Sequence, residues 1–357
     1  MEETCVILNL LGFENAVLGA AFLLLQKGMG GMIENVILRD TKKEEWPQIR
    51  SRILNRILDN FGTMLWDRGE TDFEELERYE NFGLTHIKVK YELMDGIPAW
   101  AIIVLPEGFG AAKQYPAVVT IHGTNGTNGK YGVLGATAKK NRAYAIELAQ
   151  RGYVTISPDQ FGYGEAMNDP AYKEMADQFY DNYPDWSLTT IRLLGHMRCV
   201  DILLRLGYVK ADGIGTMGNS LGGCAVMYLA AMDERISAAV MSTGISPWAT
   251  NIYRSLNRER QLDPQHTDAM RQHGVSPWEL NEMLSLCAPR AIMCLEPFND
   301  PHNPDPMATI ECVHRAWQVY NLLEQSQNLA LYMHGDGHDT VDEVRDMAYD
   351  WFDRHLK

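Results

Sequence analysis

The sequence predicts an α/β fold built on a mostly parallel sheet with helices on both faces. Three observations support this: apolar strand-like runs alternate with helix-like stretches over residues 84–357, most connections are short, and polar turns follow the strand-like runs. Sheets of this kind carry their sites at the carboxyl ends of the strands. The 357 residues are 46% hydrophobic and 22% charged, as in ordinary globular proteins. The net charge of −15 argues against nucleic acid and anionic membranes as partners.

The first 80 residues are predicted to form a helical arm on a main domain at residues 81–357. A helix is expected over residues 42–79, because large apolar residues recur there at helical spacing. An apolar run at residues 16–25 is too short to span a bilayer; a docking helix, a dimer contact and an upstream extension all remain open for it. The arm is therefore the candidate contact for a homo-oligomer. The recurring apolar residues are Trp46, Ile49, Ile53, Ile57 and Phe61.

The main domain is predicted to begin with an antiparallel pair of strands. Residues 84–93 alternate in polarity, Asp95-Gly96 is a hairpin turn, and residues 97–105 return as the second strand. Residues 115–121 are apolar and β-branched throughout, as expected of a strand buried on both faces. Further strands are expected at residues 153–157, 213–219, 235–242, 288–295 and 329–333, and helices at residues 142–151, 191–206, 310–323 and 341–356.

The motif Gly218-Asn219-Ser220-Leu221-Gly222 follows one of these strands and precedes an apolar helix-like stretch. It fits the G-x-S-x-G nucleophile elbow, in which a serine is held on a sharp turn between strand and helix. Small neighbours are needed because the backbone passes close on either side. The turn would present the hydroxyl at a helix N-terminus, where N–H groups can stabilise an oxyanion. Ser220 is therefore the candidate nucleophile.

His122-Gly123 follows a buried strand at the position where this architecture builds the other half of an oxyanion hole. The candidate donors are the backbone N–H of Leu221 and one near Thr124. The alternative is a Gly/Asn-rich loop with no special role. After the next strand, Asp159 is expected to brace its turn rather than to react.

An acid and a histidine would complete a serine–acid–histidine order along the chain. Asp300 is preferred as the acid, because it lies a few residues past a strand end; Glu296 and Asp305 in the same loop remain alternatives. His338 is preferred to His334, because its loop position gives it the reach back to the serine. In such a triad the histidine moves the proton, and the acid holds the imidazole and stabilises its charged form.

Residues 244–282 form a long polar stretch rich in tryptophan, arginine and histidine. An insertion of this length in a compact domain is usually functional, which favours a lid or a substrate wall. The alternative is a solvated excursion that carries unpaired charges.

The cysteine pattern, the first residues of the chain and the missing binding motifs allow predictions about the compartment and the cofactor. The six cysteines show neither disulfide nor metal spacing, which favours a reducing compartment. The start Met1-Glu2-Glu3 is acidic where a signal peptide would be basic, so a cytoplasmic location is predicted. No histidine spacing suits a metal, and no phosphate loop or dinucleotide fingerprint occurs. We therefore expect no metal and no cofactor.

Six segments together resemble the α/β-hydrolase superfamily, and most closely its dienelactone hydrolase and acetyl xylan esterase-like branches. The resemblance covers residues 84–357 and implies an α/β-hydrolase fold with a Ser-Asp-His triad. Dienelactone hydrolases proper use cysteine where this chain has Ser220, and many relatives have histidine where it has Asn219. The segments are IHG at 121–123, PDQFGYG at 158–164, GNSLGG at 218–223, APR at 288–290, NDP at 299–301 and GH at 337–338.

The function expected from these residues is hydrolysis of a small carboxylic ester, with acetylated carbohydrate among the candidate substrates. A peptidase of the prolyl-oligopeptidase kind is the first alternative, but only residues 1–83 precede the first predicted strand, too few for the β-propeller such enzymes carry. A hydrolase-fold protein that binds its ligand without turnover is the second alternative. It is disfavoured because Ser220 and His338 are both retained.

Overall fold

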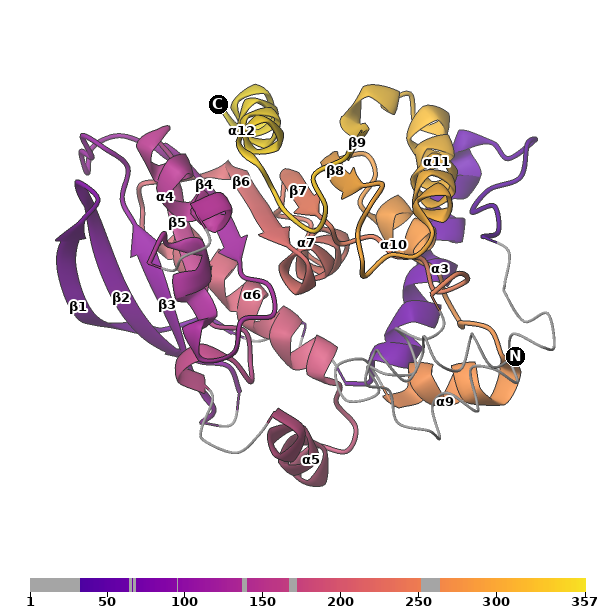
Figure 1. Ribbon diagram of the computed structural model, residues 1–357, viewed down its shortest axis with the longest axis horizontal. Helices are drawn as coiled ribbons and strands as arrows, with labels where there is room; N and C mark the ends of the chain where they lie inside the picture. The colour runs from indigo at the N-terminus through magenta and orange to yellow at the C-terminus, as the bar shows by residue number, and fades with distance from the viewer. Residues whose placement is uncertain are drawn as a thin grey trace.

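A central sheet organises the molecule (Figure 1). The computed structural model describes residues 33–63, 66, 69–94, 96–136, 140–166, 172–251 and 264–357. Within these residues nine strands form one sheet, in the order β1-β2-β3-β5-β4-β6-β7-β8-β9. The strands are β1 Phe73–Asn81, β2 Leu84–Glu92, β3 Pro98–Val104, β4 Tyr115–Ile121, β5 Val154–Pro158, β6 Val209–Asn219, β7 Ala238–Ser242, β8 Ala291–Pro297 and β9 Leu329–His334.

The sheet is antiparallel at one edge and parallel elsewhere. β1 pairs with β2, β2 with β3 and β3 with β5, all antiparallel. From β5 through β4 and β6 to β9 the pairings are parallel. This confirms the predicted fold class and the predicted hairpin of β2 and β3. Because the parallel strands end at the same edge, the loops after β4, β6, β8 and β9 converge there.

Helices cover both faces of the sheet, and each face has its own hydrophobic core. The larger core takes buried side chains from α3, α6, α7, α10 and α11, and the smaller core takes them from α4 and α12. Among the described helices, none has the length and apolar character required to cross a bilayer. The helices are α3 Trp46–Phe61, α4 Tyr144–Gln150, α5 Tyr172–Asn182, α6 Leu188–Arg205, α7 Leu221–Met232, α9 Pro264–His273, α10 Leu280–Leu286, α11 Pro306–Leu322 and α12 Asp342–Leu356.

The helix expected over residues 42–79 is wrong in its second half. α3 is followed by Gly62, which has a φ of 74°, and residues 73–81 form β1 instead. β1 joins β2 through a two-residue turn at Phe82 and Gly83, and both have positive φ, as in type I′ hairpin turns. The Glu-rich sequence of β1 favours a helix locally, but pairing with β2 outweighs that weak preference.

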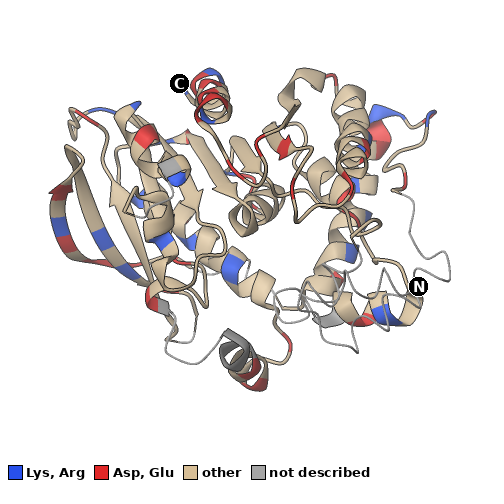
Figure 2. Cartoon of the chain, in the orientation of Figure 1, with Lys and Arg blue, Asp and Glu red and all other residues tan. Residues whose placement is uncertain are grey.

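Charged residues recur along the outer strands of the sheet, as the red and blue segments of β1 and β2 in Figure 2 show. Most residues of β1 are exposed, and five of its nine residues are Glu or Arg. Charges on an edge strand oppose its pairing with strands of other molecules. β1 therefore ends the sheet on this side.

α3 packs onto the main core rather than standing apart from it. Ile57 is fully buried and Phe61 is almost so. The Phe61 ring lies edge-on to Tyr228 of α7, with ring centroids 5.6 Å apart, and 5.9 Å from the ring of Trp278. The apolar face that the sequence shows at helical spacing thus becomes part of the larger core.

A buried lysine fixes the turn after β5. Lys130 is completely buried and pairs with Asp159 at 2.7 Å and with Glu165 at 2.6 Å. Asp159 also accepts hydrogen bonds from the backbone N–H groups of Lys130 and Glu165, at 2.8 and 3.0 Å. Asp159 therefore braces this turn, as the sequence predicts. Lys88 adds a further, partly exposed ion pair to Glu165 at 2.8 Å.

We predict that Lys130→Met lowers the free energy of unfolding by about 3–5 kcal/mol, because it leaves buried Asp159 without its cation. Urea denaturation followed by circular dichroism measures the change. Lys88→Met is the matched control, since this lysine is more exposed and pairs with Glu165, the outer carboxylate of the same network, and not with Asp159; the loss of stability in this variant should stay below about 1 kcal/mol. Equal losses in the two variants would show that burial does not set the strength of this network.

Candidate active site

Ser220 lies on the turn between β6 and α7 in a strained backbone conformation, with φ of 60° and ψ of −121°. Residues other than glycine rarely adopt a positive φ, and strain of this kind concentrates at functional sites. The flanking glycines permit the turn. A Cβ on Gly218 would lie 2.5 Å from the Gly222 carbonyl group, and one on Gly222 would overlap the carbonyl oxygen of Ile121. Larger residues would therefore force the turn open.

His338 and Asp300 are hydrogen-bonded, with His338 Nδ1 and Asp300 Oδ2 2.7 Å apart. Burial opposes ionisation of Asp300, but hydrogen bonds from His338 and from the His302 N–H, together with the charges of those two histidines, outweigh it, so the pKa of Asp300 is lowered. An ionised carboxylate only accepts hydrogen bonds, so Nδ1 of His338 is the donor. In the neutral imidazole, Nε2 is then free to accept a proton.

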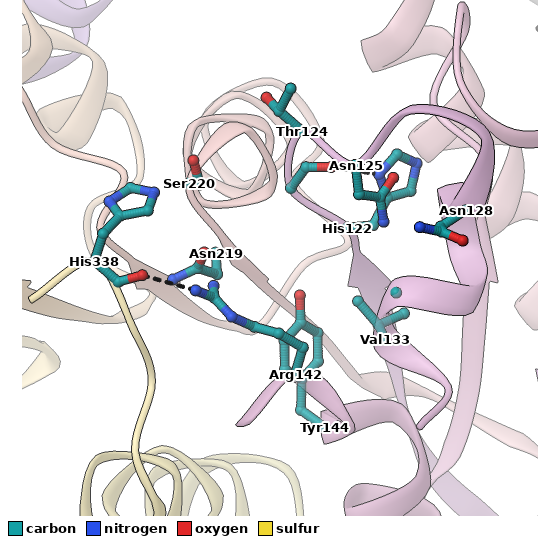
Figure 3. A pocket seen from close by; sticks show the side chains of 12 residues that line it. His122, Thr124, Asn125, Asn128, Val133, Arg142, Tyr144, Asn219, Ser220 and His338 are labelled. Carbon is teal, nitrogen blue, oxygen red and sulfur yellow. Dashed lines mark hydrogen bonds between the residues drawn. The ribbon is translucent and has the colours of Figure 1, made fainter. Parts of the chain in front are cut away.

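Ser220 and His338 line the same cavity, whose volume is about 370 Å³. Figure 3 shows them on one side of the cavity, with Asn128 and Val133 on the other. Both side chains are in the described part of the chain, and no hydrogen bond joins them there. The structure thus brings together the predicted serine and histidine. The lining residues are His122, Gly123, Thr124, Asn125, Asn128, Gly132, Val133, Arg142, Tyr144, Asn219, Ser220 and His338.

The two alternative acids have other partners. Glu296 is almost fully buried and accepts hydrogen bonds from the backbone N–H groups of Gly244 and Ile245, at 2.9 and 3.0 Å. Asp305 caps the N-terminus of α11. Of the three candidate carboxylates, Asp300 is the one that contacts the histidine.

The alternative histidine, His334, is directed elsewhere. It ends β9, is 5% exposed, and its Nδ1 lies 3.3 Å from the backbone N–H and 3.4 Å from the carboxylate of Asp336. Burial lowers its pKa. It does not line the cavity that Ser220 shares with His338.

His122 shapes the turn after β4 and stays neutral. Its Nε2 accepts a hydrogen bond from the Gln160 backbone N–H at 3.1 Å, so its Nδ1 carries the proton and donates to the Gly123 carbonyl at 2.7 Å. Complete burial lowers the pKa of His122 to about 4. This turn lies against the elbow, since a Cβ on Gly123 would be 3.0 Å from the carbonyl oxygen of Asn219.

The two candidate oxyanion donors come from the loop after β4 and from the first turn of α7. Thr124 lines the cavity just after the His122-Gly123 turn. Leu221 is the first residue of α7, where backbone N–H groups have no partner within the helix. The role of these N–H groups as oxyanion donors stays a prediction.

The sequence did not reveal two residues that support the site. Arg142 Nη2 donates to the carbonyl oxygen of His338 at 2.8 Å and pairs with Asp339 at 3.2 Å. The Tyr144 hydroxyl donates to the carbonyl oxygen of Ile121 at 2.8 Å. Arg142 is 196 positions from His338, so no local pattern could have signalled this contact.

The segment at residues 244–282 contains α9 and the start of α10, and residues 252–263 lie outside the described part. Trp248 and Trp278 are buried, with ring centroids 5.9 Å apart, and both belong to the larger core. Of the residues described in this segment, none lines the cavity around Ser220. A lid or substrate wall here stays a prediction.

The chain is similar to one known protein family over part of its length, and to several curated proteins. Residues 100–266 match the model of the dienelactone hydrolase family. Over 160 residues the chain is 29% identical to 2,6-dihydropseudooxynicotine hydrolase of Paenarthrobacter nicotinovorans, which covers 44% of this chain and 35% of that protein. Over 152 residues it is 27% identical to dipeptidyl-peptidase 5 of Porphyromonas gingivalis. This match covers 40% of this chain and 19% of that protein. The chain thus spans well under half the length of these curated relatives.

Solved structures match over nearly the whole chain. The glucuronoyl esterase of Solibacter usitatus superposes with a TM-score of 0.72 over 90% of this chain and 97% of that chain, at 15% identity. A carbohydrate esterase family 15 glucuronoyl esterase of Caldicellulosiruptor kristjansonii superposes with a TM-score of 0.62 over 91% of both chains, at 18% identity. At such low identity, these likenesses establish a shared fold.

We predict that acid destabilises the protein partly through His122. Unfolded, this histidine takes up a proton near its ordinary pKa of about 6.5, whereas in the folded protein it does so only near about 4. The unfolded state therefore binds more protons between these values, and stability falls as the pH falls. The contribution lost between pH 7 and pH 5 is about 2 kcal/mol.

Urea denaturation of the wild type and of His122→Gln at both pH values measures this contribution. The variant is expected to be less stable at pH 7 but to lose about 2 kcal/mol less on acidification. An equal loss in the two proteins would contradict the assignment of a neutral His122.

Proposed function

We propose that this chain is a serine carboxylic-ester hydrolase that acts on small acyl esters. Its α/β-hydrolase fold and its match to the dienelactone hydrolase family over residues 100–266 support the proposal. One observation carries the proposal: the elbow serine, Ser220, shares a cavity with His338, and His338 is hydrogen-bonded to buried Asp300. Nucleophile, base and orienting acid are the three groups that acyl transfer requires.

In the proposed mechanism, Ser220 Oγ attacks the carbonyl carbon of the ester while His338 Nε2 takes its proton. The resulting tetrahedral oxyanion accepts hydrogen bonds from the Leu221 N–H and from an N–H near Thr124. Its collapse breaks the ester bond, and the alkoxide leaves with the proton from His338. Water then attacks the acyl-enzyme with His338 again as base, which frees the acid and restores Ser220.

Each supporting group has a defined role in this mechanism. Asp300 holds the His338 tautomer with its proton on Nδ1 and stabilises the imidazolium form. Its lowered pKa keeps it ionised at neutral pH. An oxyanion donor in sites of this kind contributes about a hundredfold to a thousandfold in rate.

The cavity supports a small, polar substrate. Its volume of about 370 Å³ is at the lower end of the range for small-molecule sites, about 300–1,000 Å³. Asn125, Asn128 and Arg142 place polar side chains in its lining. Such a lining suits an alcohol portion rich in hydroxyl groups, so acetylated carbohydrate is the substrate class to examine first.

A serine peptidase is the second candidate function. The match to dipeptidyl-peptidase 5, over 40% of this chain, favours it. The same serine, histidine and acid would serve, because amide hydrolysis also passes through an acyl-enzyme. Peptidyl p-nitroanilides and p-nitrophenyl esters distinguish the two functions when they are compared on the same preparation.

We predict that the purified protein hydrolyses p-nitrophenyl acetate and butyrate, and that Ser220→Ala and His338→Ala each lower kcat by at least about a thousandfold. The reason is that they remove the nucleophile and its base. Release of p-nitrophenol measures turnover.

His334→Ala is the matched control for His338→Ala. It removes a histidine only four residues away, at the end of β9, and this histidine does not line the cavity. It should retain most of the activity. Wild-type levels of turnover in Ser220→Ala, or loss of activity in His334→Ala as deep as in His338→Ala, would contradict the proposed roles.

A further inference from the structure

Four uncharged polar side chains form a closed cluster directly beneath the elbow. Asn219, Ser242, Thr243 and Thr340 are each 3% exposed or less. The Asn219 amide nitrogen lies 2.9 Å from Thr243 Oγ1, 3.1 Å from Thr340 Oγ1 and 3.2 Å from Ser242 Oγ. Ser242 Oγ and Thr340 Oγ1 are themselves 2.9 Å apart. We call this set the Asn219 cluster.

The Asn219 cluster joins the segment that carries the serine to the segment that carries the histidine. Asn219 directly precedes Ser220, and the Ser220 backbone N–H donates to Thr243 Oγ1 at 3.0 Å. Thr340 lies two residues after His338. The hydroxyl of Thr340 is therefore a direct link between the base of the elbow and the histidine loop.

The backbone of Thr340 is also held by hydrogen bonds, so its side-chain link to Asn219 can fix where the histidine loop lies relative to the elbow. Its N–H donates to the side chain of Asp339 at 2.9 Å, and its carbonyl oxygen accepts a hydrogen bond from Arg345 of α12 at 2.6 Å. On the other side of the loop, Asn299 accepts from the Gly337 N–H at 2.9 Å, which ties the loop to the end of β8. The hydrogen bond between Asn219 and Thr340 joins the same loop to the end of β6.

We propose that Asn219 and Thr340 are positioning residues that set the separation of Ser220 and His338 for proton transfer. The inference rests on the proposed function and adds residues that touch neither substrate nor the reacting atoms. Buried amide and hydroxyl groups are costly unless paired, and apolar residues could fill the same space. Hydrogen bonds, unlike apolar contacts, fix direction and register, which is what a serine and a histidine from different loops require.

The test removes the hydroxyl group of Thr340 while the shape of the side chain stays nearly the same. Thr340→Val keeps the size and branching of the side chain but removes its hydrogen bonds to Asn219 and Ser242. Thr340→Ser keeps the hydroxyl. Thr216→Val is the control. Thr216 is a fully buried threonine on β6, the strand that ends at Asn219, and its hydroxyl donates to the Val119 carbonyl at 3.0 Å, away from the Asn219 cluster.

Three quantities are measured for each protein: kcat and KM for p-nitrophenyl acetate, and the rate of covalent labelling of Ser220 by a fluorophosphonate. Thr340→Val should lower kcat and the labelling rate by about tenfold to a hundredfold, with KM within about twofold of wild type. Thr340→Ser and Thr216→Val should stay within about threefold of wild type in both rates. A purely structural role would affect Thr216→Val and Thr340→Val alike.

Several results would overturn the inference. These are a Thr340→Val enzyme with wild-type kcat and labelling, a loss that appears only in KM, or a Thr340→Ser enzyme as impaired as Thr340→Val. If Thr340→Val does not fold, Asn219→Ala tests the other end of the same hydrogen bond with the same readouts. Wild-type labelling without ester turnover would refute the proposed function alone, and the labelling rates would still test the inference. A wild type that neither labels nor turns over would refute both.

Discussion

The close approach of the chain at the turn after β6 is the constraint on which the rest of the site depends. Ser220 has a positive φ, and the backbone of Ile121 passes so near Gly222 that no side chain fits between them. This contact holds the end of β4 against the start of α7. The cost of the strained serine is offset by burial and hydrogen bonding around it, as at other sites that store backbone strain.

The parallel sheet turns this local constraint into a site. The loops after β4, β6, β8 and β9 converge at one edge, so His122, Ser220, Asp300 and His338 come together although they are far apart in the sequence. The surroundings of His122 and Asp300 then give these two residues different charge states. His122 is neutral and structural because burial lowers its pKa, whereas Asp300 is kept ionised by its hydrogen bonds. The histidine loop is held by the hydrogen bond between Asn219 and Thr340 and by the contacts of Arg142 with His338 and Asp339.

The sequence was most informative where a local pattern decides the structure. Alternation of strands and helices predicted the sheet, and the glycines around Ser220 predicted the elbow. It misled at residues 73–81, where a Glu-rich segment that favours a helix becomes β1 because it can pair with β2. It could not reveal Arg142 or the link from Asn219 to Thr340, because these contacts join residues 196 and 121 positions apart. Such contacts exist only once the sheet has assembled.

The most direct test of the central claim is to identify the residue that becomes acylated. The protein is mixed with p-nitrophenyl acetate, quenched in acid within the first turnovers, digested and analysed by mass spectrometry. The account predicts an acetyl group on Ser220, which lies in the Gly218–Gly222 motif. Acetylation of another residue during active turnover, with Ser220 unmodified, would contradict it.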